Sequence, residues 1–138
     1  SEMCIRDRGN LDAFRDWGFA GDYVEGMWLM MQHHEPDDWV LATGETHSVK
    51  EFVSKAFQSV NLEWEDYVKT SDKFYRPNEV NHLLGDSSKA QEKLNWTPKV
   101  SFDNLVEMMV ENDIKLAKQE KVLLSEGLIS PTWESPKS

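Results

Sequence analysis

Apolar side chains recur at helical spacing in several parts of this chain. Between Asp22 and His33 they fall at i, i+3, i+4 and i+7, which predicts a helix with one apolar face. The positions on this face are Val24, Met27, Trp28 and Met31. Tyr23 and Met30 widen the face, so we expect this helix to be buried on most sides. His33-His34-Glu35-Pro36 should end it, because a proline disfavours helical geometry in the residue before it.

Two more helices carry signals at their first residues. Ser48-Val-Lys-Glu51 is a capping box, in which the serine hydroxyl accepts a backbone N–H and the glutamate reaches back. The helix that follows is expected to bury Phe52, Val53, Ala56, Phe57 and Val60. Ser101 should cap the longest helix, from Phe102 to about Lys121. Its expected core stripe is Phe102, Leu105, Val106, Met109, Val110, Ile114 and Ala117.

Short apolar or alternating runs between the helices predict strands. Trp39–Thr43 is apolar and is followed by Gly44, which favours a buried strand. Leu62–Asp66 alternates and predicts a second strand, and the polar residues 67–73 predict a loop. We expect Phe74–Pro77 to be extended, because the proline restricts the residue before it.

The remaining segments give weaker patterns. Ser88–Leu94 predicts a short helix capped by Asp86 or Ser87. Ser1–Arg8 has no clear period and is expected to be a ragged end. Residues 125–138 carry glycine, serine and two prolines and are expected to fray.

Composition sets limits on the kind of protein. The chain has 138 residues and 39% hydrophobic residues, enough for one packed α/β domain or part of a larger one. Its formal net charge of −10 argues against nucleic acid or an anionic membrane as the partner. No apolar run approaches the roughly 20 residues of a membrane-spanning helix. Cys4 is the only cysteine, so no internal disulfide can form, and we expect a cytoplasmic protein.

Several kinds of chemistry have no motif in this sequence. It contains no glycine-rich dinucleotide-binding turn, no Walker-type phosphate loop and no Tyr-x-x-x-Lys. A metal site is not expected either. His33 and His34 are adjacent and would point to different sides of a helix, whereas His47 lies outside the helix that carries Glu51.

Two arginines are the best candidates for a ligand-binding role. Arg15 and Arg76 each stand beside aromatic residues and a carboxylate, and a pair of guanidinium groups could clamp a diphosphate. The alternative is structural: Arg15 could pair with Asp16 or Asp12, and Arg76 with a surface carboxylate. Glu79 could be a lone surface acid or could accept the vicinal hydroxyls of a ribose.

The same segments carry a family resemblance. The matching blocks are Asn10–Gly18, Asp22–Glu25 with Met27–Met30, Ala42–Val49 with Glu51–Val53, Tyr75–Pro77 with Glu79-Val80, and Leu84–Asp86 with Ser88–Ala90, Lys93-Leu94 and Trp96. Together they closely resemble the GDP-mannose 4,6-dehydratase family. The resemblance runs from about Gly9 to about Lys121.

The resemblance implies that this chain is the C-terminal, substrate-binding part of an extended short-chain dehydrogenase fold of Rossmann type. It divides the chain into a non-matching segment 1–8, a sugar-nucleotide-binding part 9–121 and a tail 122–138. NADP and the catalytic residues would belong to an N-terminal half that is absent here. The chain alone is therefore expected to be inactive.

Roles for individual residues also follow from the resemblance. Arg15 and Arg76 would contact the GDP diphosphate, and Glu79 would contact the ribose. The pocket around them would be shaped by Asp16, Trp17 and Tyr75. The whole enzyme would convert GDP-mannose to GDP-4-dehydro-6-deoxy-mannose by internal redox and loss of water, and would be a homo-oligomer.

Two other functions remain open at this point. One is a part of a different nucleotide-sugar epimerase, dehydratase or reductase. The other is a non-catalytic module that binds a sugar nucleotide. If the chain is part of the enzyme, the absent N-terminal half would have covered part of the apolar helix at Asp22–Met31. We therefore also expect exposed apolar patches and a tendency to associate.

Overall fold

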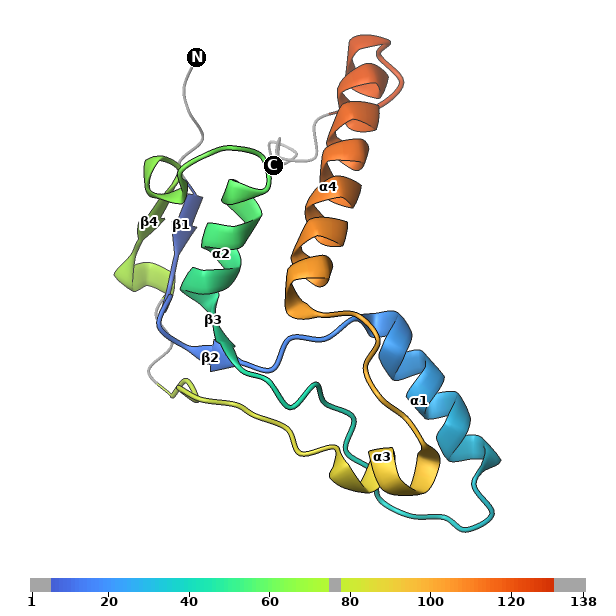
Figure 1. Ribbon diagram of the computed structural model, residues 1–138. Coiled ribbons are helices and arrows are strands. Elements are labelled where there is room, and N and C mark those ends of the chain that lie inside the picture. Colours follow the sequence, from blue (N-terminus) through green and yellow to red (C-terminus); the bar gives the residue numbers. More distant parts are fainter. Residues whose placement is uncertain (1–5, 75–77, 131–138) are drawn as a thin grey trace.

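A computed structural model describes residues 6–74 and 78–130 of the chain (Figure 1). Its α-helices are α1 (Ala20–Gln32), α2 (Val49–Gln58), α3 (Ser88–Leu94) and α4 (Phe102–Ser125). Two short 3-10 helices are η1 (Trp64–Asp66) and η2 (Asp72–Phe74). The strands are β1 (Arg6–Arg8), β2 (Phe14–Arg15), β3 (His47–Ser48) and β4 (Val68–Thr70).

The helices gather at two ends of the molecule (Figure 1). Helices α1 and α3 form one end, and α2 and α4 form the other together with β1 and β4. Strands β1 and β4 pair in parallel, whereas β2 and β3 pair antiparallel with Arg15 opposite His47. Long segments without regular structure connect the two ends, and the candidate site described below lies among them.

A buried cluster of Ala90, Leu94 and Trp96 joins α1 to α3. The Trp96 indole N–H donates to the backbone carbonyl of Asp22 at 2.8 Å, in a buried position. The Asp22 carboxylate in turn accepts the backbone N–H groups of Lys99 and Val100 at 2.9 and 3.0 Å. These contacts fix the start of α1 against the turn that follows α3.

The predicted serine caps of α2 and α4 are confirmed, whereas the expected apolar face of α2 is buried only at Val53, and Phe52, Ala56, Phe57 and Val60 are partly buried. Ser48 Oγ accepts the N–H of Glu51 at 3.0 Å, and Ser101 Oγ accepts the N–H of Asn104 at 3.3 Å. The Glu51 side chain does not reach back to the cap, because it binds His47 Nδ1 at 3.0 Å. The buried residues of these two helices are Val53, Phe102, Leu105 and Val106.

Helix α4 is longer than expected and its far part is not buried. It ends at Ser125, four residues beyond the expected Lys121. The expected core stripe is correct for the first turns only. From Met109 onward none of the α4 residues is buried: Met109 and Ile114 are exposed, and Val110 is only partly buried.

Helix α3 has the predicted bounds, with Ser87 in the cap position. The Ser87 side chain makes no cap hydrogen bond and accepts instead from Gln91 Nε2 at 3.0 Å. The Asp86 carboxylate accepts the backbone N–H of Ser88 at 3.0 Å. The free N–H group of Ser88 in the first turn of α3 is therefore paired with the Asp86 carboxylate, although Ser87 occupies the cap position.

The predicted strand at Trp39–Thr43 does not form. Within the described residues, the backbone of Trp39–Ala42 makes no hydrogen bond, and a strand needs a paired neighbour as well as a suitable sequence. The sequence of this segment suits a strand, but no neighbouring strand pairs with it among the described residues.

Three further local predictions are wrong. Leu62–Asp66 is not a strand, since Trp64–Asp66 forms η1. The predicted loop 67–73 contains β4, and Ser1–Arg8, expected to be irregular, contains β1. These two short strands pair with each other across more than 60 residues of sequence, and local pattern carries little information about such a pairing.

The stripe of α1 that was expected to be buried faces outward. Val24, Met27, Trp28 and Met31 have exposed fractions of 63, 56, 58 and 81%. The expectation that this helix is buried on most sides is therefore wrong, whereas the expected exposed apolar patch is present on α1. The helices of the described residues include none with the length and apolar character needed to cross a membrane.

We predict that the α1 stripe binds an apolar dye and promotes self-association. The double substitution Met27→Gln/Met31→Gln should lower both, because it removes the two methionine side chains from the exposed face. Dye fluorescence and sedimentation velocity measure the effects. The control is Leu116→Gln/Val122→Gln, which changes two exposed residues of α4. A wild-type chain that is monomeric and binds no dye would contradict the prediction.

We predict that Trp96→Phe lowers the free energy of unfolding by about 1–3 kcal/mol, because the buried carbonyl of Asp22 loses its donor. Urea unfolding followed by circular dichroism measures the change. Trp28→Phe is the matched control, since Trp28 is 58% exposed and should tolerate the change. Equal effects at the two positions would show that the indole N–H contributes nothing specific.

Candidate functional site

Strand β2 brings Arg15 to Glu79, its partner 64 residues away in sequence. Arg15 Nη2 lies 3.1 Å from Glu79 Oε1, and both side chains are about one quarter exposed. Arg15 Nη1 also donates to the carbonyl oxygen of Phe14 at 2.7 Å. The structural alternative that paired Arg15 with Asp12 or Asp16 is wrong, because Glu79 is the acid that it contacts.

The Asp16 carboxylate is a junction between three chain segments. Its Oδ1 accepts the backbone N–H of Thr43 at 3.0 Å and the Thr43 hydroxyl at 2.6 Å. Its Oδ2 accepts the backbone N–H groups of Gly44 and Gly85 at 3.0 and 3.3 Å. Partial burial acts to raise the pKa of Asp16, but these hydrogen bonds outweigh it and hold the pKa below its usual value of 3.8.

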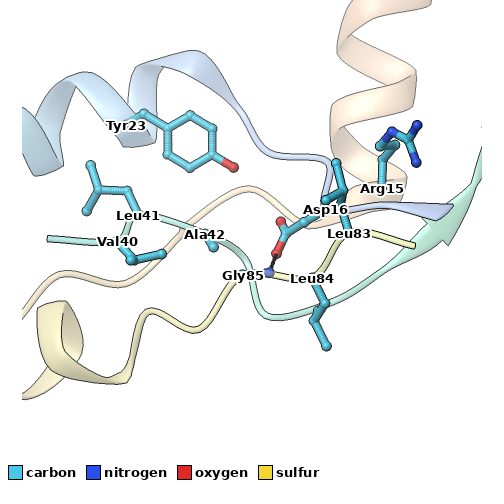
Figure 2. Close-up of a pocket in the computed structure, with 9 residues that line it drawn as sticks. All are labelled: Arg15, Asp16, Tyr23, Val40, Leu41, Ala42, Leu83, Leu84 and Gly85. Carbon is cyan, nitrogen blue, oxygen red and sulfur yellow. Dashed lines mark hydrogen bonds between the residues drawn. The ribbon is translucent and has the colours of Figure 1, made fainter. Parts of the chain in front are cut away.

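A hollow of about 340 Å³, which we call the Arg15 hollow, opens beside this junction (Figure 2). Its lining residues are Arg15, Asp16, Tyr23, Val40, Leu41, Ala42, Leu83, Leu84 and Gly85. Figure 2 shows the Asp16 carboxylate turned toward Gly85, with the Arg15 guanidinium pointing away from it. The hollow thus has mostly apolar walls and carries its charged groups along one side.

Close approach of the backbone shapes this hollow. A Cβ on Gly85 would lie 2.1 Å from the Cβ of Ala42, so only glycine allows these segments to meet. The Tyr23 hydroxyl also faces this region, and burial, followed by the charges of Asp16 and Asp22, raises its pKa.

The other expected site residues lie elsewhere or outside the described residues. The Trp17 indole N–H donates to the His47 carbonyl at 3.3 Å, and its ring packs on Phe52 with centroids 4.8 Å apart. Trp17 lines a separate hollow next to the start of α4, so it does not border the Arg15 hollow. Tyr75 and Arg76 fall within residues 75–77, outside the described residues.

The described part of the chain offers no centre for a metal ion. Across residues 6–74 and 78–130, no three His, Cys, Asp or Glu side chains are grouped closely enough to hold one. The Arg15 guanidinium is suited to bind an anion, and the Glu79 carboxylate next to it can accept hydrogen bonds from hydroxyl groups.

Several residues of the site were not identified from the sequence. Tyr23, Thr43 and Gly85 come from three different segments and meet only in the folded chain. Asp16 was already a candidate from the sequence, but its partners in Thr43, Gly44 and Gly85 carry no signal in the sequence that would link them to it.

We predict that Asp16→Asn flattens the acid dependence of stability. Because the pKa of Asp16 is lowered in the folded chain, its ionised form stabilises the fold above about pH 4, and this stabilisation is lost as pH falls through the folded pKa. The free energy of unfolding should therefore fall less steeply with acid in the variant than in the wild type. Urea unfolding from pH 7 to pH 3 measures this, with Glu107→Gln on exposed α4 as the charge-removing control. Parallel curves for wild type and Asp16→Asn would refute it.

Solved structures with a similar fold are enzymes of sugar nucleotides. A dTDP-glucose 4,6-dehydratase from Bacillus anthracis, in complex with NAD, matches 81% of this chain and 35% of its own, with a TM-score of 0.72 and 12% identity. A UDP-glucose 4-epimerase from Thermotoga maritima, with UDP-glucose, matches 83% of this chain and 36% of its own, with a TM-score of 0.71 and 24% identity. These similarities show the fold, and they confirm the expected fold class.

Sequence relatives are closer. GDP-mannose 4,6 dehydratase 1 of Arabidopsis thaliana is 57% identical over 119 residues, which cover 86% of this chain and 33% of the relative. The human GDP-mannose 4,6 dehydratase is 50% identical over 127 residues, which cover 80% of this chain and 34% of the relative. This chain therefore spans about a third of the length of the curated relatives that it matches.

The family profile described as GDP-mannose 4,6 dehydratase matches residues 2–109, which include β1 through the first turns of α4 and every described residue of the Arg15 hollow. The identities to the relatives extend over most of the chain. By both measures the chain belongs to the GDP-mannose 4,6-dehydratase family.

Proposed function

We propose that this chain is the nucleotide-sugar-binding part of an enzyme that converts GDP-mannose to GDP-4-dehydro-6-deoxy-mannose. The observation that carries the proposal is the meeting of Arg15 and Glu79 beside the hollow, in a chain 50–57% identical to proteins named for this activity. The contribution of this part is binding, since contacts to the distant GDP position the sugar that reacts.

In this proposal Arg15 and Arg76 contact the diphosphate. Arg15 carries five N–H donors in a planar fork, and in the described structure only Nη1 and Nη2 donate. Donors therefore remain for phosphate oxygens without breaking the contact with Glu79. A charge-assisted hydrogen bond of this kind contributes roughly 1.5–3 kcal/mol.

Glu79 accepts the ribose hydroxyls in this proposal, and the position of Glu79 next to Arg15 supports this. Because the ribose and the diphosphate are joined directly in a nucleotide, their binding groups must lie side by side. Arg15 and Glu79 satisfy this requirement at 3.1 Å. Asp16, Trp17 and Tyr75 shape the surroundings, Asp16 from the wall of the hollow and Trp17 from the neighbouring hollow.

The hollow is small for a ligand as large as a sugar nucleotide. Its volume of about 340 Å³ lies near the lower end of the roughly 300–1,000 Å³ typical of ligand sites. The exposed α1 stripe and the unpaired segment Trp39–Ala42 are further surfaces without cover in this chain. In our proposal the part of the relatives that has no counterpart here completes the site.

The residues present do not fit a dinucleotide cofactor. The loop at Gly44 has a positive φ of +78°, but it leads into β3 and not into a phosphate-binding helix. We therefore assign NADP and the catalytic groups to the N-terminal part of the whole enzyme. That enzyme supplies the redox and elimination chemistry, and we place it in the cytoplasm as a homo-oligomer.

We predict that the chain binds GDP and GDP-mannose more tightly than UDP-glucose or dTDP-glucose. Titration calorimetry with the four ligands tests this. A preference for UDP-glucose would favour a different nucleotide-sugar epimerase or dehydratase, and no binding of any of them would count against a binding role for this part alone.

We predict that Arg15→Ala weakens GDP binding about 10- to 100-fold, as expected for the loss of one charge-assisted contact. In a complete enzyme the same change should raise KM for GDP-mannose with a smaller effect on kcat. Lys115→Ala is the control, because it removes one positive charge from an exposed position on α4. An unchanged KM would refute the diphosphate role of Arg15.

A further inference from the structure

The Asp16 carboxylate uses its hydrogen-bonding capacity entirely within the chain. It accepts four hydrogen bonds, from Thr43 N, Thr43 Oγ1, Gly44 N and Gly85 N. An ionised carboxylate has about four acceptor sites. Asp16 therefore has little capacity left to bind a hydroxyl group of a ligand, although it follows Arg15 directly in the sequence.

The segments that Asp16 holds are the ones that flank Arg15. Thr46 Oγ1 lies within hydrogen-bond distance of the carbonyl oxygens of both Arg15 and Leu83, at 3.4 and 3.2 Å. The position of Thr46 depends on the loop at Thr43 and Gly44, which Asp16 fixes. One carboxylate therefore secures the loop on one side of Arg15.

The segment that carries Glu79 is held by the backbone of Phe14 and, at its far end, by Asp16. Phe14 N donates to the carbonyl of Asn81 at 2.7 Å, and Leu83 N donates to the carbonyl of Phe14 at 3.1 Å. The bond from Gly85 N to Asp16 holds the far end of this segment. Glu79 lies two residues before Asn81, the first residue in these contacts. Its distance from Arg15 therefore depends on which residues of this segment pair with Phe14.

We infer that Asp16 is a positioning residue, which sets the Arg15 guanidinium against Glu79 for nucleotide binding without touching the nucleotide. The inference rests on the function proposed above. A free arginine side chain populates many rotamers, and ordering it on binding costs conformational entropy. Holding it in place before the ligand arrives removes part of this cost from binding.

The chain contains a matched control for this idea. Asp22 is a second carboxylate that accepts backbone N–H groups, two of them at 2.9 and 3.0 Å, and at 5% exposed it is more buried than Asp16. Its donors are Lys99 and Val100, which do not border the Arg15 hollow. Asp22→Asn should destabilise the fold in a comparable way while leaving Arg15 in place.

The first test is calorimetry of GDP binding to the wild type, Asp16→Asn and Asp22→Asn at a temperature where all three are folded. We expect at least a roughly tenfold weaker affinity for Asp16→Asn, equivalent to about 1.4 kcal/mol, and a change of less than about twofold for Asp22→Asn. If Asp16→Asn does not fold, Thr43→Val replaces it, since this change removes the 2.6 Å hydroxyl donor to Asp16, together with the weaker contacts of the same hydroxyl with the Glu45 backbone. We expect Thr43→Val to weaken GDP binding by about threefold, on the same scale.

The second test needs no ligand and so separates this inference from the proposed function. Nitrogen-15 NMR reports the rotation of the Arg15 guanidinium, with the signals assigned through Arg15→Lys. Separate, slowly exchanging Nη signals in the wild type and Asp22→Asn, but averaged signals in Asp16→Asn or Thr43→Val, support positioning by Asp16. Unchanged Arg15 signals in these variants overturn it, as does equal GDP affinity for the Asp16 and Asp22 variants. A wild type that binds no GDP counts against a binding role for this part alone, and the NMR result then decides the role of Asp16.

Discussion

One carboxylate holds together the three irregular segments between the two helical ends of this molecule. Asp16 receives donors from Thr43, Gly44 and Gly85, which are 27 to 69 residues away in sequence. These segments have few ladder hydrogen bonds of their own, because β2 and β3 are each two residues long. A charged acceptor supplies stronger hydrogen bonds than a neutral one, which is why a single residue can fix so much irregular backbone.

The site depends on this constraint. Arg15 and Glu79 lie on different segments, and neither residue is placed by a helix or a long strand. Loops carry binding residues well only when something rigid positions them. Here the rigid element is the network around Asp16, supported by the Thr46 hydroxyl between Arg15 and Leu83.

A second anchor, between Asp22 and Trp96, holds α1 and α3 together but leaves one face of α1 bare. The same end of the molecule contains the unpaired segment Trp39–Ala42. An apolar helix face and a β-prone segment without a partner are both surfaces that folding normally covers. Their presence agrees with a chain that spans about a third of its curated relatives. Binding and chemistry would then be divided between two parts of one enzyme, and this chain would carry the binding part.

The four helices were predictable from the sequence, and so were the first residues of α2, α3 and α4, because their signals are local; α1, which has no side-chain cap, begins at Ala20 and not at the expected Asp22. Ser48 and Ser101 cap the helices that the pattern predicts, and α3 has the expected bounds. Helical periodicity did not reveal which face is buried, since that depends on the neighbours that the fold supplies, and the α1 stripe lacks them.

The sequence by itself determined the helical segments, the acidic character, the absence of a dinucleotide-binding motif and the family, because each of these depends on residues close together in the chain. Only the tertiary structure decided that β1 pairs with β4, that Trp17 faces away from the Arg15 hollow and that Arg15 meets Glu79. Strand pairing and side-chain convergence are long-range contacts, and their free energy depends on partners that no local pattern identifies.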